Sequence, residues 1–448
     1  MSNQNKYAEN LLAKAEKPGK DAMKLHPFYK GKIEVTPKVP VRNLNDFAIW
    51  YTPGVAEPCK DIVKNPEKVF EHTNKSNFVA VVTDGTRVLG LGDIGPEAGL
   101  PVMEGKALLF KYLGGVDAFP ICIKEKDPEK FIEITKSLEP TFGGINLEDI
   151  AQPKCFYILE RLRNEMGIPV WHDDQQGTAS VILAGLINAL KIVAKDMKNV
   201  KIAMIGAGAA NICISRILIL AGFNPKNIIM VDSKGILHKG REDLNNPATN
   251  EKWEMCNKTN VEQRTGGIKE ALVNIDVCIA LSSPGPGIIK KEWITKMNKD
   301  AIVFACANPI PEIWPWEAKE AGARIVATGR GDFPNQVNNS LGFPGIFRGI
   351  LDVWATTVTD NMCIAAAKSL AESAEKNGLS EDYIVPAMDE WKVFVDEAVA
   401  CGMQAIKEGV ARRILTKDEL HKSVEEKITR AQKQVQLLMH EGIINKSI

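Results

Sequence analysis

The sequence predicts an α/β protein: a doubly wound parallel sheet of the Rossmann type, joined to an N-terminal α/β domain and a helical C-terminal region. Two observations support this fold class. Short apolar runs alternate with helix-length segments through the middle of the chain, and a glycine-containing turn follows the first of these runs. We therefore expect the N-terminal domain over residues 1–172, the doubly wound domain over 173–339 and the helical region over 340–448.

The N-terminal region carries a mixed pattern of helices and strands. Residues 1–45 combine helix-like segments with Pro37 and Pro40, which interrupt any regular element. Apolar runs and glycine-rich turns alternate after about residue 77. The expected elements are strands at Phe78–Val82, Val88–Leu91 and Ala118–Ile123 and a helix at Glu104–Tyr112.

The middle of the chain contains five short β-branched runs, several of them near the ~25–30 residue spacing of a βαβ unit. Such wholly apolar runs suit strands that are buried on both faces of a parallel sheet. The expected strands are Ile202–Ile205, Ile228–Val231, Val277–Leu281, Ile302–Ala305 and Ile325–Ala327. After Pro344 the pattern becomes helical. The tail carries an apolar stripe suited to packing or to a subunit contact, formed by Ile428, Val435 and Leu438.

The composition is that of a globular protein, with 45% hydrophobic and 25% charged residues among 448. Lys plus Arg and Asp plus Glu number 56 each, so net charge favours neither a nucleic acid nor a membrane surface as partner. Nine scattered cysteines without a CxxC pair are typical of reduced thiols in an intracellular protein, and we expect a cytoplasmic location. The polar N-terminus lacks the apolar core of a secretory signal, and the longest apolar stretch, Ala179–Ala194, is too short to cross a bilayer.

A glycine turn between the first central strand and the following helix predicts a dinucleotide site. Gly206 permits the tight turn, and Gly208 lets the backbone approach a pyrophosphate at the helix N-terminus. Asn211 replaces the third glycine of the usual fingerprint, but the next strand ends in Asp232, where an acid bonds the ribose hydroxyls of NAD. Nearby residues could instead bind the 2′-phosphate of NADP, and these are Ser233, Lys234, Lys239 and Arg241. Both cofactors remain candidates, and the alternative is a purely structural glycine turn.

Two adjacent acidic pairs form a candidate metal site. Glu148-Asp149 follows a glycine-rich stretch, and Asp173-Asp174 precedes an apolar helix. Neighbouring residues on a strand point to opposite faces, so a pair can meet one ion only at a strand end or a turn. Three carboxylates around one ion select a hard divalent cation, Mg²⁺ or Mn²⁺. The alternatives are helix caps or solvated acidic faces.

Six ordered motifs between about Ala48 and Ala411 resemble those of malic enzymes, and the match is closest to the shorter, bacterial-type members of that family. The motifs are Tyr51–Ala56, Val88–Gly95, Val102–Lys106, Asn146–Asp149, His172–Ala179 and Asn338–Gly345. The resemblance implies an oxidoreductase that uses NAD or NADP and Mg²⁺ or Mn²⁺ to convert L-malate to pyruvate and CO₂. It also implies a homodimer or an assembly of dimers.

The resemblance further implies a role for each matching residue. Tyr51 is the expected general acid and Lys106 the general base, with Asp173 orienting Lys106. The expected metal ligands are Glu148, Asp149 and Asp174. The expected substrate-binding residues are Lys106, Asn308, Asn339 and Arg87, the last by a less direct match. The expected cofactor-binding residues are Thr178, Gly206, Ala207, Gly208, Ala209, Asp232, Ser233 and Asn308.

Three other functions are compatible with parts of this pattern. A malolactic-type lyase shares the motifs and cofactors but releases lactate and CO₂ without net redox change. A different metal-dependent hydroxy-acid or amino-acid dehydrogenase would reduce its cofactor without releasing CO₂. A non-catalytic Rossmann binding module would leave Tyr51, Lys106 and the two acidic pairs without a purpose.

Overall fold

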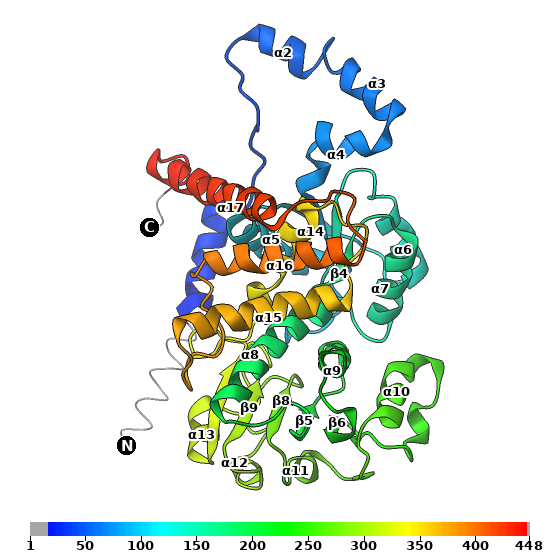
Figure 1. Ribbon diagram of the computed structural model, residues 1–448, viewed down its shortest axis with the longest axis vertical. Helices are drawn as coiled ribbons and strands as arrows, with labels where there is room; N and C mark the ends of the chain where they lie inside the picture. Colours follow the sequence, from blue (N-terminus) through cyan, green and yellow to red (C-terminus); the bar gives the residue numbers. More distant parts are fainter. Residues whose placement is uncertain (1–16, 446–448) are drawn as a thin grey trace.

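In the computed structural model, which describes residues 17–445, the apolar runs of the N-terminal region form a four-stranded parallel sheet in the order β2-β1-β3-β4 (Figure 1). Its strands are β1 Phe78–Thr83, β2 Asp117–Cys122, β3 Gly144–Leu147 and β4 Val170–His172. Three longer helices cover it, and these are α5 Pro96–Gly114, α6 Pro128–Lys136 and α7 Lys154–Glu165. The strand alternation divides the core. Ala80 and Val82 belong to the core that contains Phe131 of α6, while Val79 and Val81 belong to the core that contains Phe110 of α5.

The second sheet has six strands in the order β10-β9-β8-β5-β6-β7. Its strands are β5 Ile202–Ile205, β6 Ile228–Asp232, β7 Gly235–Ile236, β8 Val277–Ala280, β9 Ala301–Ala305 and β10 Ala323–Thr328. The five predicted central strands are therefore confirmed, with ends that move by up to two residues. Only β7 was not predicted, a two-residue strand that pairs antiparallel with β6.

Helices flank this Rossmann sheet, with α8 before its first strand and the others between successive strands. They are α8 Thr178–Ile192, α9 Ala209–Ala221, α10 Asn250–Lys258, α11 Ile268–Ala271, α12 Lys291–Ile294 and α13 Pro315–Glu320. The strand order reverses beside β5, because β6 lies on one side of it and β8 on the other. Ligands of open α/β sheets bind at the carboxyl edge next to such a reversal.

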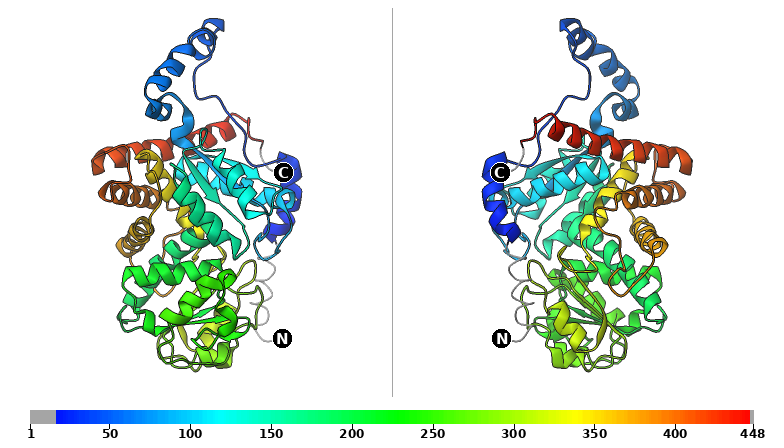
Figure 2. Two further views of the ribbon diagram at one scale, coloured as in Figure 1. Left: turned by 90° about the vertical axis from the view of Figure 1, so that its right-hand side faces the viewer. Right: turned by 90° about the vertical axis from the view of Figure 1, so that its left-hand side faces the viewer.

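The C-terminal helices bridge the two sheet domains (Figures 1 and 2). They are α14 Phe343–Asp352, α15 Asp360–Asn377, α16 Lys392–Lys407 and α17 Lys417–His440. α14 packs against α5, where the ring centroids of Phe343 and Phe110 are 4.6 Å apart, and α15 packs against α8. Part of the predicted tail stripe is a packing face, because Ile428 on α17 is fully buried and α17 lies against α5 and α16, while Val435 and Leu438 are half-buried.

In the N-terminal domain one expected strand was wrong, and one expected helix was confirmed with different bounds. Residues Val88–Leu91 form a turn, closed by a single bridge between Val88 and Gly92, because Leu89 adopts a positive φ of 47° that reverses the chain. The helix expected at Glu104–Tyr112 begins earlier, at Pro96, since proline is well suited to the first helical position.

The structure bears on the expected state of the cysteines and on the search for membrane-spanning helices. All nine cysteines are free thiols, and seven of them are buried. Within residues 17–445, no helix combines the length and the apolarity required to cross a bilayer.

Candidate active site

The two acidic pairs meet because the strands that precede them are parallel neighbours. β3 ends at Leu147 and β4 ends at His172, and these two residues are partners in the sheet register. Glu148-Asp149 therefore leaves the same edge of the sheet as Asp173-Asp174. Residues 173–177 form a π-type turn that leads into α8. Strand ends and turns are the settings in which both members of an acidic pair can approach one point.

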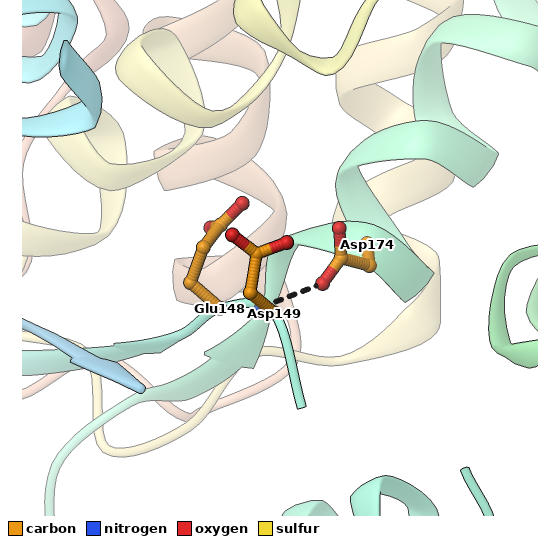
Figure 3. A group of neighbouring side chains, drawn as sticks. All are labelled: Glu148, Asp149 and Asp174. Carbon is orange, nitrogen blue, oxygen red and sulfur yellow. Dashed lines mark hydrogen bonds between the residues drawn. The ribbon is translucent and has the colours of Figure 1, made fainter. Parts of the chain in front are cut away.

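Three carboxylates converge at this edge (Figure 3). One carboxylate oxygen from each of Glu148, Asp149 and Asp174 lies within 4.8 Å of the other two. Asp149 has a positive φ of 55°, and its backbone N–H donates to Asp174 Oδ2 at 2.9 Å, which fixes the Asp174 carboxylate beside the backbone of Asp149. Among the described residues Asp149 Oδ2 is buried without a hydrogen-bond partner.

This cluster has the chemistry of a divalent-cation site. Burial and the neighbouring Asp174 raise the pKa of Asp149 to about 8, and burial raises the pKa of Glu148 well above its ordinary value. Carboxylates crowded in this way are stabilised in their charged form by a cation. The donors are all oxygens, which suits Mg²⁺ or Mn²⁺. These residues therefore fit the predicted ion.

Lys106 on α5 points into the same cluster and is only 8% exposed. Its Nζ lies 2.5 Å from Asp173 Oδ2 and 3.0 Å from Glu148 Oε1, and 4.4 Å from the centroid of the Phe343 ring. Burial by itself lowers the pKa of a lysine, but the carboxylates of Asp173 and Glu148 outweigh this effect and raise the pKa of Lys106 above its ordinary value. The amine therefore needs the charge of these carboxylates to be balanced before it can accept a proton.

The glycine turn after β5 has the geometry expected of a pyrophosphate loop. Gly206 has a φ of +97°, and a Cβ at this position would lie 2.4 Å from the carbonyl oxygen of Leu281. Gly208 faces open space and precedes Ala209, the first residue of α9. The side-chain amide of Asn211 donates to the carbonyl oxygens of Ile205 and Gly206, at 3.1 and 2.7 Å. Asn211, which replaces the third glycine of the fingerprint, therefore stabilises the loop through these two hydrogen bonds.

Asp232, the acid at the end of β6, is already hydrogen-bonded to the guanidinium group of Arg241. Asp232 accepts two hydrogen bonds of 3.0 Å from Arg241, one to each carboxylate oxygen. Arg241 uses its remaining N–H groups on Asp243, at 2.7 and 3.0 Å, and on the carbonyl oxygen of Gly235 at 3.4 Å. All five guanidinium donors of Arg241 are therefore occupied.

The remaining predicted residues lie along the boundary between the two sheet domains. A Cβ on Gly90 would lie 2.7 Å from the carbonyl oxygen of Asn308, so the 88–92 turn of one domain touches the Asn308 loop of the other. Asn339 lies beside the acidic turn, because its Cβ is 3.2 Å from a Cβ built on Gly177. The backbone of Arg87 donates to the carbonyl oxygen of Asp149 at 3.0 Å, while its side chain is exposed.

Both sheet domains match family models of the same enzyme family. The family models described as "Malic enzyme, N-terminal domain" and "Malic enzyme, NAD binding domain" match residues 30–163 and 175–408. A Bacillus subtilis protein named bifunctional malic/malolactic enzyme is 51% identical over 400 residues, which cover 89% of this chain and 96% of that protein. A Geobacillus stearothermophilus NAD-dependent malic enzyme is 50% identical, over 86% of this chain and 78% of that one. The crystal structure of Entamoeba histolytica malic enzyme superposes with a TM-score of 0.95 at 51% identity, over 100% of this chain and 93% of that one.

This chain belongs to the malic enzyme family. Membership confirms the resemblance drawn from the six motifs and the α/β Rossmann fold class predicted from strand spacing.

One predicted residue lies apart from the malic enzyme site within a single chain. Tyr51 caps the C-terminus of a short helix, α2 Leu44–Trp50, and is 71% exposed. Figures 1 and 2 show α2 and the next helix, α3 Ala56–Lys64, projecting beyond the body of the molecule, away from α5 and β4. The structure brings Lys106 and the acidic pairs together but leaves Tyr51 outside this group.

Two supporting residues were missed by sequence reasoning although a signal for them exists. Asn146 Nδ2 donates to Glu148 Oε2 at 2.9 Å, and Trp171 Nε1 donates to Asp173 Oδ1 at 3.1 Å. Each lies two residues before the acid that it holds. Side chains two apart on a strand share a face, so this spacing predicts the contacts.

Proposed function

We propose that this chain catalyses the oxidative decarboxylation of L-malate to pyruvate and CO₂ with a nicotinamide dinucleotide and Mg²⁺ or Mn²⁺. The observation that carries the proposal is the contact of one buried lysine, Lys106, with the edge of a three-carboxylate cation site. The same chain carries a Rossmann sheet within residues 175–408, which match the family model described as "Malic enzyme, NAD binding domain". A bound divalent cation supplies Lewis-acid polarisation of substrate oxygens, and the dinucleotide accepts the hydride.

Residues of the chain itself transfer the proton and position the substrate. Lys106 takes the proton of the malate C2 hydroxyl, and Asp173 holds the lysine in place at 2.5 Å. When the charge of the ligand carboxylates is balanced, burial dominates and lowers the pKa of Lys106 toward that of a base. The Phe343 ring covers the amine and keeps water from it. Arg87, Asn308 and Asn339 line the domain boundary and position the malate carboxylates, which contributes through proximity.

We further propose that the cofactor is NAD⁺ in preference to NADP⁺. A 2′-phosphate beside Asp232 would meet a carboxylate, and the nearest guanidinium, Arg241, has all its donors occupied by Asp232, Asp243 and Gly235. The carboxylate oxygens of Asp232 retain lone pairs that can accept bonds from ribose hydroxyls. Ser233, Thr178, Ala207 and Ala209 are the proposed backbone and side-chain contacts elsewhere in the dinucleotide site.

A malolactic activity is a second candidate, because a relative at 51% identity bears a name that includes it. The two reactions share binding residues and differ in whether the reduced cofactor is released or returns its hydride to pyruvate. The cytoplasmic location and the homodimer, or assembly of dimers, predicted from the sequence stay proposals.

The test is an assay of purified protein with L-malate and Mn²⁺. Absorbance at 340 nm is followed with NAD⁺ and with NADP⁺, and pyruvate and lactate are measured. We expect pyruvate and NADH to appear together, with lower kcat/KM for NADP⁺, and Lys106→Ala to lose about 10²–10⁴-fold in kcat. Lys111→Ala, on the same helix and partly exposed in an ion pair with Asp117, is the control and keeps its activity.

Each result has a defined meaning. Lactate without accumulated NADH supports the malolactic activity instead. Absence of turnover with either cofactor, in protein that binds NADH, contradicts both.

A further inference from the structure

The loops after β8, β9 and β10 leave the same edge of the Rossmann sheet, because these three strands are parallel neighbours. Asn308 lies on the loop after β9 and is half-buried. Its side-chain amide has no hydrogen-bond partner among the described residues, so the amide is free to bind a ligand. An amide without a partner of its own keeps one orientation only if other residues hold the loop that carries it.

Glu312 joins the loop after β8 to the loop after β9. Its Oε1 accepts hydrogen bonds from the backbone N–H and the hydroxyl of Ser282, at 2.8 and 3.1 Å. Its Oε2 accepts a hydrogen bond from the backbone N–H of Ala307, the residue before Asn308, at 3.1 Å. Ser282 also borders the glycine turn, since a Cβ on Gly206 would lie 3.2 Å from its Cα. The Glu312 carboxyl group therefore ties the loop of Asn308 to the segment that packs against the glycine turn.

The Glu312 carboxyl group is fully buried, and no cation pairs with it among the described residues. Burial raises the pKa of this carboxyl group, while the hydrogen bonds from Ser282 and Ala307 act in the opposite direction. A buried carboxyl group costs stability unless its oxygens are hydrogen-bonded. Both oxygens accept here, and a side-chain amide cannot reproduce this because one of its two positions is a donor. The two loops therefore require a side chain with two acceptors.

Arg330 holds the same loop from the side of β10. Its Nη1 donates to the carbonyl oxygen of Pro309 at 2.6 Å, and its Nε and Nη2 each donate to Asp332 at 2.8 Å. Gly329, the preceding residue, lies against the amide itself, because a Cβ on Gly329 would be 2.9 Å from Asn308 Nδ2. The residues before and after Asn308 are therefore both fixed, one by a carboxyl group and the other by a guanidinium group.

We propose that Glu312 and Arg330 are positioning residues that hold the Asn308 amide in the orientation in which it binds malate beside the nicotinamide. Glu312 acts through the backbone of Ala307 and Arg330 through the backbone of Pro309, so neither has to touch the substrate. A displacement of about 1 Å in a positioning group can cost about 10²-fold in rate. This inference rests on the proposed malate chemistry and adds the means by which Asn308 is oriented.

A double-mutant cycle between Glu312 and Asn308 tests the proposal. Glu312→Gln keeps the shape but replaces one acceptor oxygen with an N–H donor, and Asn308→Ala removes the amide. Malate affinity is measured by calorimetry on protein loaded with Mn²⁺ and NADH, which cannot turn over because the cofactor is already reduced, and kcat/KM for malate is measured with NAD⁺. We expect each single variant to lose about tenfold or more in both quantities. The double variant should lose no more than Asn308→Ala, because Glu312 then has no amide to orient.

A second cycle uses Arg330→Met, which keeps the proposal testable if the buried substitution at Glu312 prevents folding. The Arg330 side chain is 15% exposed, and we expect the same non-additive loss with Asn308→Ala. The matched controls are Glu292→Gln, at an exposed position, and Arg324→Met, at a partly exposed one, and both should keep wild-type kcat/KM. Retained NADH affinity, followed by fluorescence, shows that a variant has folded.

Additive losses in both double variants would overturn the proposal, because they would show that Glu312 and Arg330 act independently of Asn308. Wild-type malate affinity in folded Glu312→Gln or Arg330→Met would overturn it as well. A wild type that neither binds nor turns over malate contradicts the proposed function together with this inference. Additive losses in an active enzyme contradict the positioning role alone.

Discussion

Glu397 provides a test of the tertiary structure that is independent of catalysis. It lies on α16, is fully buried, and neither carboxyl oxygen has a hydrogen-bond partner among the described residues. Its carboxyl group packs against the start of α14, where a Cβ on Gly345 would lie 2.2 Å from Oε2. Burial raises the pKa of Glu397 well above its ordinary value, so the folded protein holds this proton to a higher pH than the unfolded chain does.

The sign and size of the effect follow from proton linkage. Below the ordinary pKa of 4.5 both folded and unfolded chains hold the proton, and the group makes no pH-dependent contribution. As pH rises above that value the unfolded chain releases the proton while the folded chain retains it, so the folded state loses stability. Over the pH range in which only the folded chain retains this proton, the free energy of unfolding falls by about 1.4 kcal/mol per pH unit.

The perturbation is Glu397→Gln, which has nearly the same shape and no ionisable proton. The free energy of unfolding is measured by urea titration at intervals from pH 5 to pH 7, for the variant and the wild type. We expect the free energy of unfolding of the variant to rise relative to that of the wild type as pH increases, by up to about 1.4 kcal/mol for each pH unit. Glu426→Gln, at an exposed position on α17, is the control. A difference between Glu397→Gln and wild type that does not change with pH would refute the reasoning, because it would show that folding does not alter the protonation of Glu397.

Two further predictions concern the ligand sites. Asp174→Asn removes one of three converging carboxylates, and we expect calorimetric titration to show Mn²⁺ affinity reduced by about tenfold or more, while Asp382→Asn, an exposed aspartate, leaves it unchanged. Equal affinities in Asp174→Asn and wild type would remove Asp174 from the cation site. Gly206→Ala places a Cβ 2.4 Å from the carbonyl oxygen of Leu281 at a φ of +97°, so we expect NADH binding, followed by fluorescence, to weaken by about tenfold or more. Unchanged NADH binding would show that this turn does not form the pyrophosphate loop.

The sequence by itself determined those features whose information is local. The five central strands are short apolar runs with both faces buried, and this pattern is independent of what packs against them. Gly206 could be predicted because only glycine tolerates its backbone conformation so close to Leu281. The acidic pairs could be placed at strand ends for a similar reason, since adjacent side chains converge only where the strand geometry stops.

Local patterns failed where backbone reversals or proline placement mattered. The 88–92 segment is as apolar as a strand, but the positive φ of Leu89 turns it back on itself. The helix that carries Lys106 begins at Pro96, eight residues before the predicted start, because proline fits the first turn of a helix as well as a loop.

Tertiary structure alone decided which side chains share a site. Lys106 and Asp173 are 67 residues apart, and only the packing of α5 against β1 and β2 of the same sheet brings their charges to 2.5 Å. The proposed preference for NAD⁺ depends on whether the donors of Arg241 are free, which is a matter of three-dimensional partners and not of spacing. The position of Tyr51 is the clearest case. The resemblance to the family motif implies a role for Tyr51. Its place relative to Lys106 depends on how α2 and α3 pack, and no sequence pattern records that packing.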